Sequence, residues 1–294
     1  GFIGRNLIED LSKNKNNKIY ATFNKRKKQN LKNVTWVKCD LRNDDFSKRI
    51  TKNIDVVIQA AATSSGSKDV VFRPYLHVTD NAVMNAYLFR NSYLNKVKHV
   101  IFFSCTTMYK SSKKPVKENE FNSIKDIVPK YFGCGTTKVY NEAMCEFFSR
   151  IGETKFTVIR HTNVYGPYEE HKKNQASPIT KFTIQAKETG IIEIFENSEN
   201  YKRDFICVSD VCKIHEQMLK KEVSGIFNIG IGQPVSFQEI AEIIAEKYRA
   251  SIKYISMPKN IKAHYQDYTC ADLTNLNKHV IIDYKTVEEY INAK

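Results

Sequence analysis

The chain has 294 residues, enough to bury a large core in one domain or two smaller ones. Its formal charge of +14 favours anionic partners, but the basic residues are mostly lysines scattered among asparagines, without the aromatic-interleaved stripe of a nucleic-acid surface. The sequence has no apolar run of about 18 residues and no signal-peptide pattern, so we expect a cytoplasmic protein that binds neither nucleic acid nor membranes.

Strands alternate with helices through the first half of the chain. The opening Gly-Phe-Ile-Gly leads directly into an amphipathic helix that ends near Leu11. The strand-type runs that follow are short and rich in β-branched residues, and they cover 18–24, 34–40, 54–62, 99–104 and 155–166. Helical patterns at 76–93 and 130–142 separate the later strands. This alternation predicts an α/β fold with a doubly wound parallel sheet covered on both faces.

After Gly166-Pro167 the periodicity becomes less regular. Helices are predicted at 177–190, 210–220, 236–249 and 284–293, and strands at 191–195, 201–208 and 225–230. Ser236 followed by Glu239 is a capping-box signal for the third of these helices. We therefore expect a first lobe over 1–166 and a smaller mixed α/β lobe over 167–294, interleaved in space.

The seven cysteines are widely spaced and contain no CxxC or CxxH pattern. Several lie in apolar runs, as reduced core cysteines do. We therefore expect no structural disulfide and no metal site.

The strand ends are the places to look for chemistry, because ligands of a parallel sheet lie beyond its carboxyl ends. The opening Gly-Phe-Ile-Gly has the spacing of the last two glycines of a G-x-x-G-x-x-G turn, which lets a pyrophosphate approach the backbone amides at a helix N-terminus. The first glycine of that turn and the strand before it are absent. The chain is therefore expected to be a fragment or an N-terminal truncation.

A series of motifs resembles the extended short-chain dehydrogenase/reductase family, the NAD-dependent epimerases and dehydratases of nucleotide sugars. In chain order the motifs are GFIGRNL, Asp40-Leu41, Ala60–Ala62, SCTTMY, Lys138, RHTNVYGP, RDFICVSDV and FNIGIGQPVSFQEI. Their order and spacing match over nearly the whole chain. The stretches DNAVMNAYLFRNSYLNKVKHVIFFS and NVYGPYEEHKKN are most similar to the GDP-L-fucose synthase-like branch. The resemblance implies a Rossmann-type NAD(P) lobe, a substrate lobe, and a homodimer that pairs through helices including the one with Lys138.

The resemblance also assigns the cofactor contacts. The segment Gly1, Phe2, Ile3 and Gly4 would lie at the pyrophosphate, Asp40 and Leu41 at the adenine, and Ala60, Ala61 and Ala62 along the middle of the cofactor. NAD-preferring members carry an acidic residue near the end of the second strand, where this chain has Asn24 followed by Lys25 and Arg26. These cations could neutralise a 2′-phosphate, so NADP is favoured slightly over NAD. The alternative is that 25–28 is a solvated turn.

The family's chemistry uses a Ser or Thr at the end of the fifth strand and Tyr-x-x-x-Lys on a helix. Lys138 matches the lysine, but the tyrosine position falls on Cys134, and the Ser/Thr position falls on Cys105, with Ser104 and Thr106 beside it. Three interpretations remain open. Tyr131 could take the acid/base role if the helix start were rearranged, Cys134 could titrate instead because a nearby lysine lowers a thiol pKa, or the function could be weakened or lost.

On the substrate side, the resemblance implies that Asn163 contacts the substrate and that Arg203 faces a nucleotide diphosphate. His171 or Lys172 falls near the second acid/base of fucose synthase-like enzymes, although an exposed loop is an equal alternative, and Asn163 could form only a strand-end turn. The expected activity is epimerisation, dehydration or reduction of a nucleotide-activated sugar by transient hydride transfer. The main alternative is a catalytically impaired relative that binds NAD(P) or a sugar nucleotide as a regulatory or partner subunit.

Overall fold

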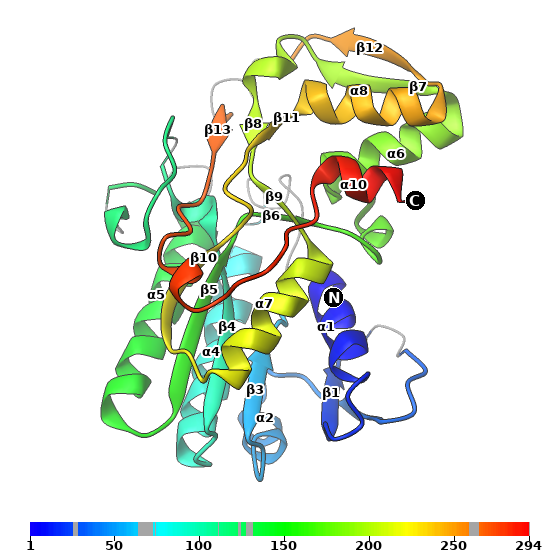
Figure 1. The fold of residues 1–294 in the computed structure, drawn as a ribbon. Coiled ribbons are helices and arrows are strands. Elements are labelled where there is room, and N and C mark those ends of the chain that lie inside the picture. Colours follow the sequence, from blue (N-terminus) through cyan, green and yellow to red (C-terminus); the bar gives the residue numbers. More distant parts are fainter. Residues whose placement is uncertain are drawn as a thin grey trace. The chain divides into compact units, whose positions relative to one another are not determined.

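A computed structural model gives the fold of the chain as two compact units (Figure 1). It describes residues 1–25, 29–63, 73, 75–110, 112–122, 125–127, 132–258 and 265–293, apart from the side chains of 76 and 173–175. The first unit comprises Gly1–Ser104, Gly133–Ile159 and Glu216–Ile226, and the second comprises Cys105–Phe132, Arg160–His215 and Phe227–Lys294. No helix in the described ranges is long and apolar enough to cross a membrane. The assignment of a cofactor lobe to 1–166 and a substrate lobe to 167–294 stays a prediction.

Parallel strands form the sheets of the first unit. The longer sheet has the order β10-β5-β4-β3, in which β3 (Val56–Gln59) pairs in parallel with β4 (His99–Cys105). Its other strands are β5 (Lys155–His161) and β10 (Gly225–Ile229), and a separate parallel pair joins β1 (Ile19–Phe23) to β2 (Val34–Lys38). The helices of this unit are α1 (Phe2–Leu11), α2 (Asp44–Ile50), α4 (Tyr75–Leu94) and α5 (Phe132–Ile151). The predicted α/β fold with a parallel, Rossmann-type sheet is confirmed.

The core of the first unit lies where α4 and α5 pack on β4 and β5. Six of the seven residues of β4 are buried, as expected for an inner strand with an unbroken apolar run. Phe89 of α4 meets Phe102 and Phe156 edge to face, with ring centroids 5.3 Å and 5.8 Å apart. Cys145 of α5 belongs to the same buried cluster. Burying each large apolar side chain stabilises the fold by about 1.5–3 kcal/mol, so this cluster fixes α5 against the strands.

The core of the second unit lies between helices and a short parallel pair of strands. Helix α6 (Pro178–Thr189) and helix α8 (Phe237–Tyr248) pack on β7 (Ile191–Phe195), and β12 (Ser251–Ile255) pairs with β7. The predicted capping box of α8 is confirmed, because Ser236 Oγ accepts the N–H of Glu239 and the Glu239 carboxylate accepts the N–H of Ser236. The remaining elements include α10 (Val287–Asn292), β6 (Asn163–Tyr165), β8 (Lys202–Arg203), β9 (Phe205–Cys207), β11 (Val235–Ser236) and β13 (Tyr268–Thr269), together with α7 (Val208–Lys220), which begins in this unit and ends in the first.

Two runs predicted as single strands are each divided in the structure. The run at 155–166 breaks at Thr162 into β5 and β6, and the run at 201–208 breaks at Asp204 into β8 and β9. At both breaks the backbone N–H still bonds to the neighbouring strand: Thr162 donates to the carbonyl of Ile229 at the end of β10, and Asp204 donates to the carbonyl of Thr269 in β13. The pieces after the breaks then pair with each other, as β6 and β9.

His215 makes the second unit sensitive to acid. It is buried on α7, its ring stacks on that of His161 with centroids 6.2 Å apart, and its Nδ1 lies 2.6 Å from the carbonyl oxygen of Val211. Burial lowers its pKa from 6.5 to about 4. Because the unfolded chain binds the proton more readily, protonation of His215 favours unfolding. The contribution of the neutral ring to the free energy of unfolding is complete above pH 6.5. It is lost as the pH falls to about 4, by about 3 kcal/mol in total.

The expected result is a steeper loss of unfolding free energy between pH 6.5 and 4.5 for the parent chain than for His215→Gln, measured by urea denaturation. The difference between the two chains isolates the histidine from the carboxylates, which titrate in both. Parallel pH profiles would show that His215 titrates normally in the folded state.

Candidate functional site

The N-terminus of α1 lies against the carboxyl end of β3. Gly1 precedes the helix without a side-chain cap, and the first turn contains no acidic residue. A Cβ added to Gly4 would lie 3.6 Å from the Cβ of Ala60, so backbone and strand end approach closely at this glycine. Amides in a first helical turn point out of the helix end and favour an anion. The glycines and Ala60 leave room at this end for a cofactor pyrophosphate, and the first turn of α1 adds no carboxylate that would repel it.

The other predicted cofactor residues differ in exposure. Phe2 and Leu41 are buried and serve the core, whereas Ile3 is half-buried. Asn24, Ala61 and Ala62 are exposed at the ends of β1 and β3. Arg26 lies outside the described residues, so its proposed contact with a 2′-phosphate stays a prediction.

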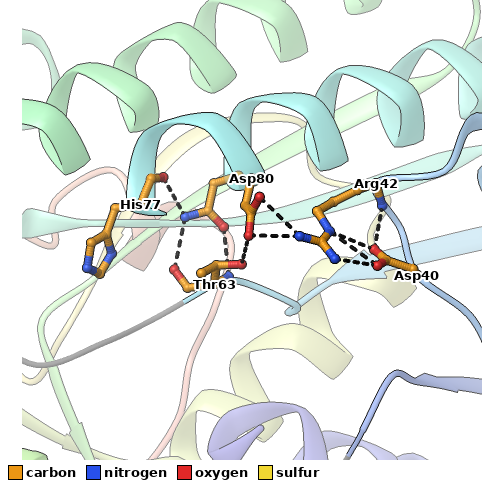
Figure 2. A network of polar contacts seen from close by, with 6 residues as sticks. Asp40, Arg42, Thr63, His77 and Asp80 are labelled. Carbon is orange, nitrogen blue, oxygen red and sulfur yellow. Dashed lines mark hydrogen bonds and ion pairs between the residues drawn. The ribbon is translucent and has the colours of Figure 1, made fainter. Parts of the chain in front are cut away.

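Asp40, at the predicted adenine position, belongs to a network of polar contacts with Arg42 (Figure 2). The Arg42 guanidinium donates from Nε and Nη2 to the Asp40 carboxylate, with the shortest distance 2.6 Å. Its Nη1 lies 3.2 Å from both carboxylate oxygens of Asp80 on α4. These hydrogen bonds, with a further one from the Arg42 backbone N–H, hold the pKa of Asp40 at about 2.

The same network reaches the segment after β3. Thr63 Oγ1 donates to Asp80 over 3.2 Å, and the backbone N–H and C=O of Thr63 bond to the side-chain amide of Asn81 at 2.9 Å and 3.1 Å. Arg42, Asp40 and Asp80 are 46%, 35% and 27% exposed, and ion pairs at such exposure stabilise a fold by only about 0–1 kcal/mol. The network therefore orders the strand ends more than it stabilises the fold. Sequence reasoning did not find Arg42 or Asp80, and only the motif position of Asp40 pointed to this place.

Lys138 and Ser104 join α5 to the carboxyl end of β4. Lys138 Nζ donates to the carbonyl oxygen of Phe103 over 2.5 Å and lies 4.8 Å from the centre of the Phe102 ring. Ser104 is buried and donates its hydroxyl to the carboxylate of Glu142, one turn after Lys138. Both contacts lie within the first unit. They hold the first half of α5, which carries Cys134 and Lys138, beside the strand end where the resemblance places the catalytic group.

The two cysteines at the expected hydroxyl positions are both half-buried. Cys134 lies in the first turn of α5, four residues before Lys138, and so shares a helix face with it. Cys105 ends β4, and its Sγ lies 2.8 Å from Thr107 Oγ1. Thr106 is turned toward β5 and donates to the carbonyl oxygen of His161 over 3.0 Å. Tyr131, the alternative acid/base residue, lies outside the described residues.

In the second unit, Asn163 and Arg203 adjoin the same buried residue, Asp204. The backbone N–H and the side-chain amide of Asn163 each lie 3.1 Å from the carbonyl oxygen of Asp204. The Arg203 guanidinium lies near the rings of Phe237 and Tyr265, 5.6 Å and 5.4 Å from their centres. It also donates to the carbonyls of Lys202 and Gln266. The structure thus shows Arg203 well fixed, while its contact with a diphosphate stays a prediction.

Asp204 is fully buried, and its carboxylate accepts backbone N–H groups from Ile231, Gly232 and Ala271 at 2.9–3.2 Å. Burial raises its pKa, and the three donors oppose that rise. The carboxylate fills the place that a Cβ on Gly230 would need. Sequence reasoning used only the motif around Asp204 and did not single out its side chain.

His171 and Lys172 lie in a 3₁₀ helix (Glu170–Gln175) that begins beside the buried Glu169. The Glu169 carboxylate accepts the Ser177 N–H and hydroxyl at 3.0 Å and 2.7 Å, and the Lys172 ammonium group lies 3.3 Å from it. His171 is exposed, and its Nδ1 lies 2.7 Å from the carbonyl oxygen of Tyr168. Of the two candidates, Lys172 is thus paired with a carboxylate, and His171 presents its ring to solvent.

The chain matches known proteins over most of its length. The sequence model of the NAD dependent epimerase/dehydratase family matches residues 1–230. Among solved structures, the UDP-N-acetylglucosamine 4-epimerase of Methanobrevibacter ruminantium, in complex with UDP-N-acetylmuramic acid, superposes with a TM-score of 0.84 at 22% identity, covering 99% of this chain and 94% of the other. The UDP-glucose 4-epimerase of Thermotoga maritima, with UDP-glucose, gives 0.84 at 24% identity over 99% and 93%. The UDP-glucose 4-epimerase of Thermus thermophilus, in complex with NAD, gives 0.82 at 19% identity over 99% and 95%.

Proposed function

The chain belongs to the NAD dependent epimerase/dehydratase family, and from this premise we propose that it is an NAD(P)-dependent enzyme that epimerises, dehydrates or reduces a nucleotide-activated sugar. The observation that carries the proposal is the attachment of α5 to β4, through Lys138 Nζ and the Phe103 carbonyl and through Ser104 and Glu142. This attachment holds a cation, and a thiol one turn before it, at one strand end. Titratable groups gathered beside a fixed charge are typical of a catalytic site.

Epimerisation and dehydration need a proton acceptor on a sugar hydroxyl and a bound oxidised nicotinamide, which would take up and return a hydride, whereas reduction needs a reduced nicotinamide, which would supply one. We assign the proton transfer to Cys134, because it lies one helical turn before Lys138, at the position where the family motif carries its acid/base tyrosine. Lys138 would lie on the same helix face. Gly1, Gly4 and Ala60 would bind the cofactor backbone, and Asn163 and Arg203 would bind the nucleotide sugar.

The experiment incubates the protein with NAD, NADP, NADH or NADPH and a panel of UDP- and GDP-sugars that includes keto sugars, and follows product sugars by chromatography and nicotinamide absorbance. Conversion of at least one sugar is expected. NADP is the cofactor that Lys25 and Arg26 would favour, and a GDP-sugar is the substrate that the fucose synthase-like stretches would favour. The absence of turnover with every sugar, under conditions where a cofactor raises the melting temperature, would overturn the catalytic proposal.

A second candidate is a catalytically impaired family member that binds NAD(P) or a sugar nucleotide as a regulatory or partner subunit. Cys105 and Cys134 favour it, since thiols stand at both positions where the family carries hydroxyl groups. This candidate predicts cofactor binding without turnover. A large gain of activity in Cys134→Tyr would support this candidate, because it would show that the parent chain lacks activity for want of the phenol at this position.

The outer face of α5 is the surface through which we propose that the chain forms a homodimer, as the family resemblance implies. Tyr140, Phe147 and Ile151 are spaced seven and four residues apart and therefore share one helix face, and all three are exposed. A contiguous exposed apolar face of this kind is typical of a protein interface.

Phe147→Glu is expected to convert a dimer to a monomer in sedimentation experiments, since a carboxylate there would lose its hydration on association. Ile281→Glu is the matched control, because it places the same charge at an exposed apolar residue outside α5 and should leave the mass unchanged. A parent chain that sediments as a monomer at micromolar concentration would contradict the dimer proposal.

A further inference from the structure

We propose that Arg42 is a positioning residue for the cofactor, which acts by joining the strand end at the adenine to the segment that runs along the middle of the cofactor. The inference rests on the proposed function, because it takes the ends of β2 and β3 to be the cofactor surface. Arg42 itself is not among the residues that the family motifs assign to that surface.

The first step is the geometry of the guanidinium. One edge of Arg42 donates to Asp40, directly after β2, and Nη1 lies at equal distances of 3.2 Å from the two oxygens of Asp80. Figure 2 shows the guanidinium lying between the two carboxylates. A planar fork with fixed donors holds two carboxylates in a defined relation, which a flexible ammonium group does not.

The second step is what the two carboxylates connect. Asp80 lies on α4 and accepts the hydroxyl of Thr63, while the next residue, Asn81, bonds to both the N–H and the C=O of Thr63. Thr63 directly follows Ala60–Ala62, the segment predicted to run along the cofactor. Arg42 therefore links the segment after β2 to the segment after β3, with α4 as the rigid support.

The third step concerns whether such a link affects folding stability or cofactor affinity. The three charged side chains are too exposed for their pairing to contribute much to folding stability. Ordering two loops before a ligand arrives, by contrast, lowers the entropy that binding must overcome and so strengthens affinity. Arg42 is therefore expected to affect cofactor affinity much more than the melting temperature.

The test compares Arg42→Met, Arg42→Lys and Asp80→Asn with the parent chain, with Arg49→Met as a control that removes an equal charge from α2 outside the network. Trp36, the only tryptophan in the sequence, lies on β2 close before Asp40, so its fluorescence can report the dissociation constants for NAD and NADP. Arg42→Met is expected to weaken both cofactors about tenfold with little change in melting temperature. Arg42→Lys and Asp80→Asn should each give part of that loss, and Arg49→Met none.

Three results would overturn the inference: equal affinities in Arg42→Met and the parent chain, a weakening that only follows the fraction of unfolded protein, or a weakening confined to NADP. The last would mean that Arg42 contacts the 2′-phosphate directly. A parent chain that binds neither NAD nor NADP would overturn the proposed function together with this inference. A parent chain that binds either cofactor but is insensitive to Arg42→Met would overturn the inference alone.

Discussion

Replacing Cys134 with alanine is expected to lower the turnover of a nucleotide sugar by about 10²–10⁴-fold, the usual loss when a positioned acid/base group is removed. Cys134 lies four residues before Lys138, and the contact of Lys138 with Phe103 fixes the helix that carries both. The substitution removes only one Sγ atom from a half-buried site, so the dissociation constant for the cofactor should stay the same. Steady-state rates and cofactor titrations on the same preparation measure the two quantities.

Cys145→Ala is a suitable control for this experiment, because it removes a buried thiol from the core-facing side of the same helix. It is expected to lower stability but not the rate per folded molecule. Turnover that is unchanged in Cys134→Ala would show that the thiol does not transfer the proton. If turnover is also higher in Cys134→Tyr than in the parent chain, the active site of the parent lacks an effective acid/base group.

Asp204→Ala is expected to destabilise the protein by about 5 kcal/mol. The carboxylate is the acceptor for three backbone N–H groups, and a buried donor left without an acceptor costs about 1–3 kcal/mol. The substitution also leaves empty the volume beside Gly230 that the carboxylate fills, and this cavity lowers stability further. Urea unfolding at neutral pH, followed by circular dichroism, measures the change in the free energy of unfolding.

Asp283→Ala provides the matched control for Asp204→Ala, since it removes an exposed carboxylate from the same unit and should change stability by less than about 0.5 kcal/mol. Asp204→Asn keeps one acceptor oxygen and should fall between the two. If Asp204→Ala unfolds at the same urea concentration as Asp283→Ala, the three backbone bonds to the Asp204 carboxylate do not contribute the expected stability.

Local sequence signals predicted the elements whose causes are themselves local. The apolar run at 100–103 became the centre of the buried strand β4, and the Ser236 and Glu239 pair became the capping box of α8. Helix α2 was not predicted although Asn43 caps it, because seven residues give too short a period to recognise. The strand breaks at Thr162 and Asp204 were also missed, since the carbonyls that accept their N–H groups come from distant parts of the chain.

In the candidate site, too, the sequence predicted what local spacing determines and missed the contacts between distant residues. Motif spacing identified Lys138 and the two cysteines, but spacing cannot show which partner a side chain chooses across 30 or more residues. Lys138 with Phe103, Ser104 with Glu142, and Arg42 with Asp80 are all pairs of that kind. They depend on the packing of helices against strands, which a single sequence does not specify.

The interleaving of the two units sets an order of assembly during synthesis. The first unit includes Glu216–Ile226, and the second starts at Cys105, so neither is a continuous stretch of chain. The chain must be synthesised as far as Ile226 before the first unit can close around its last segment, and the edge of β5 that β10 covers stays unpaired until then. Neither unit can therefore be expressed alone by cutting the gene at one point.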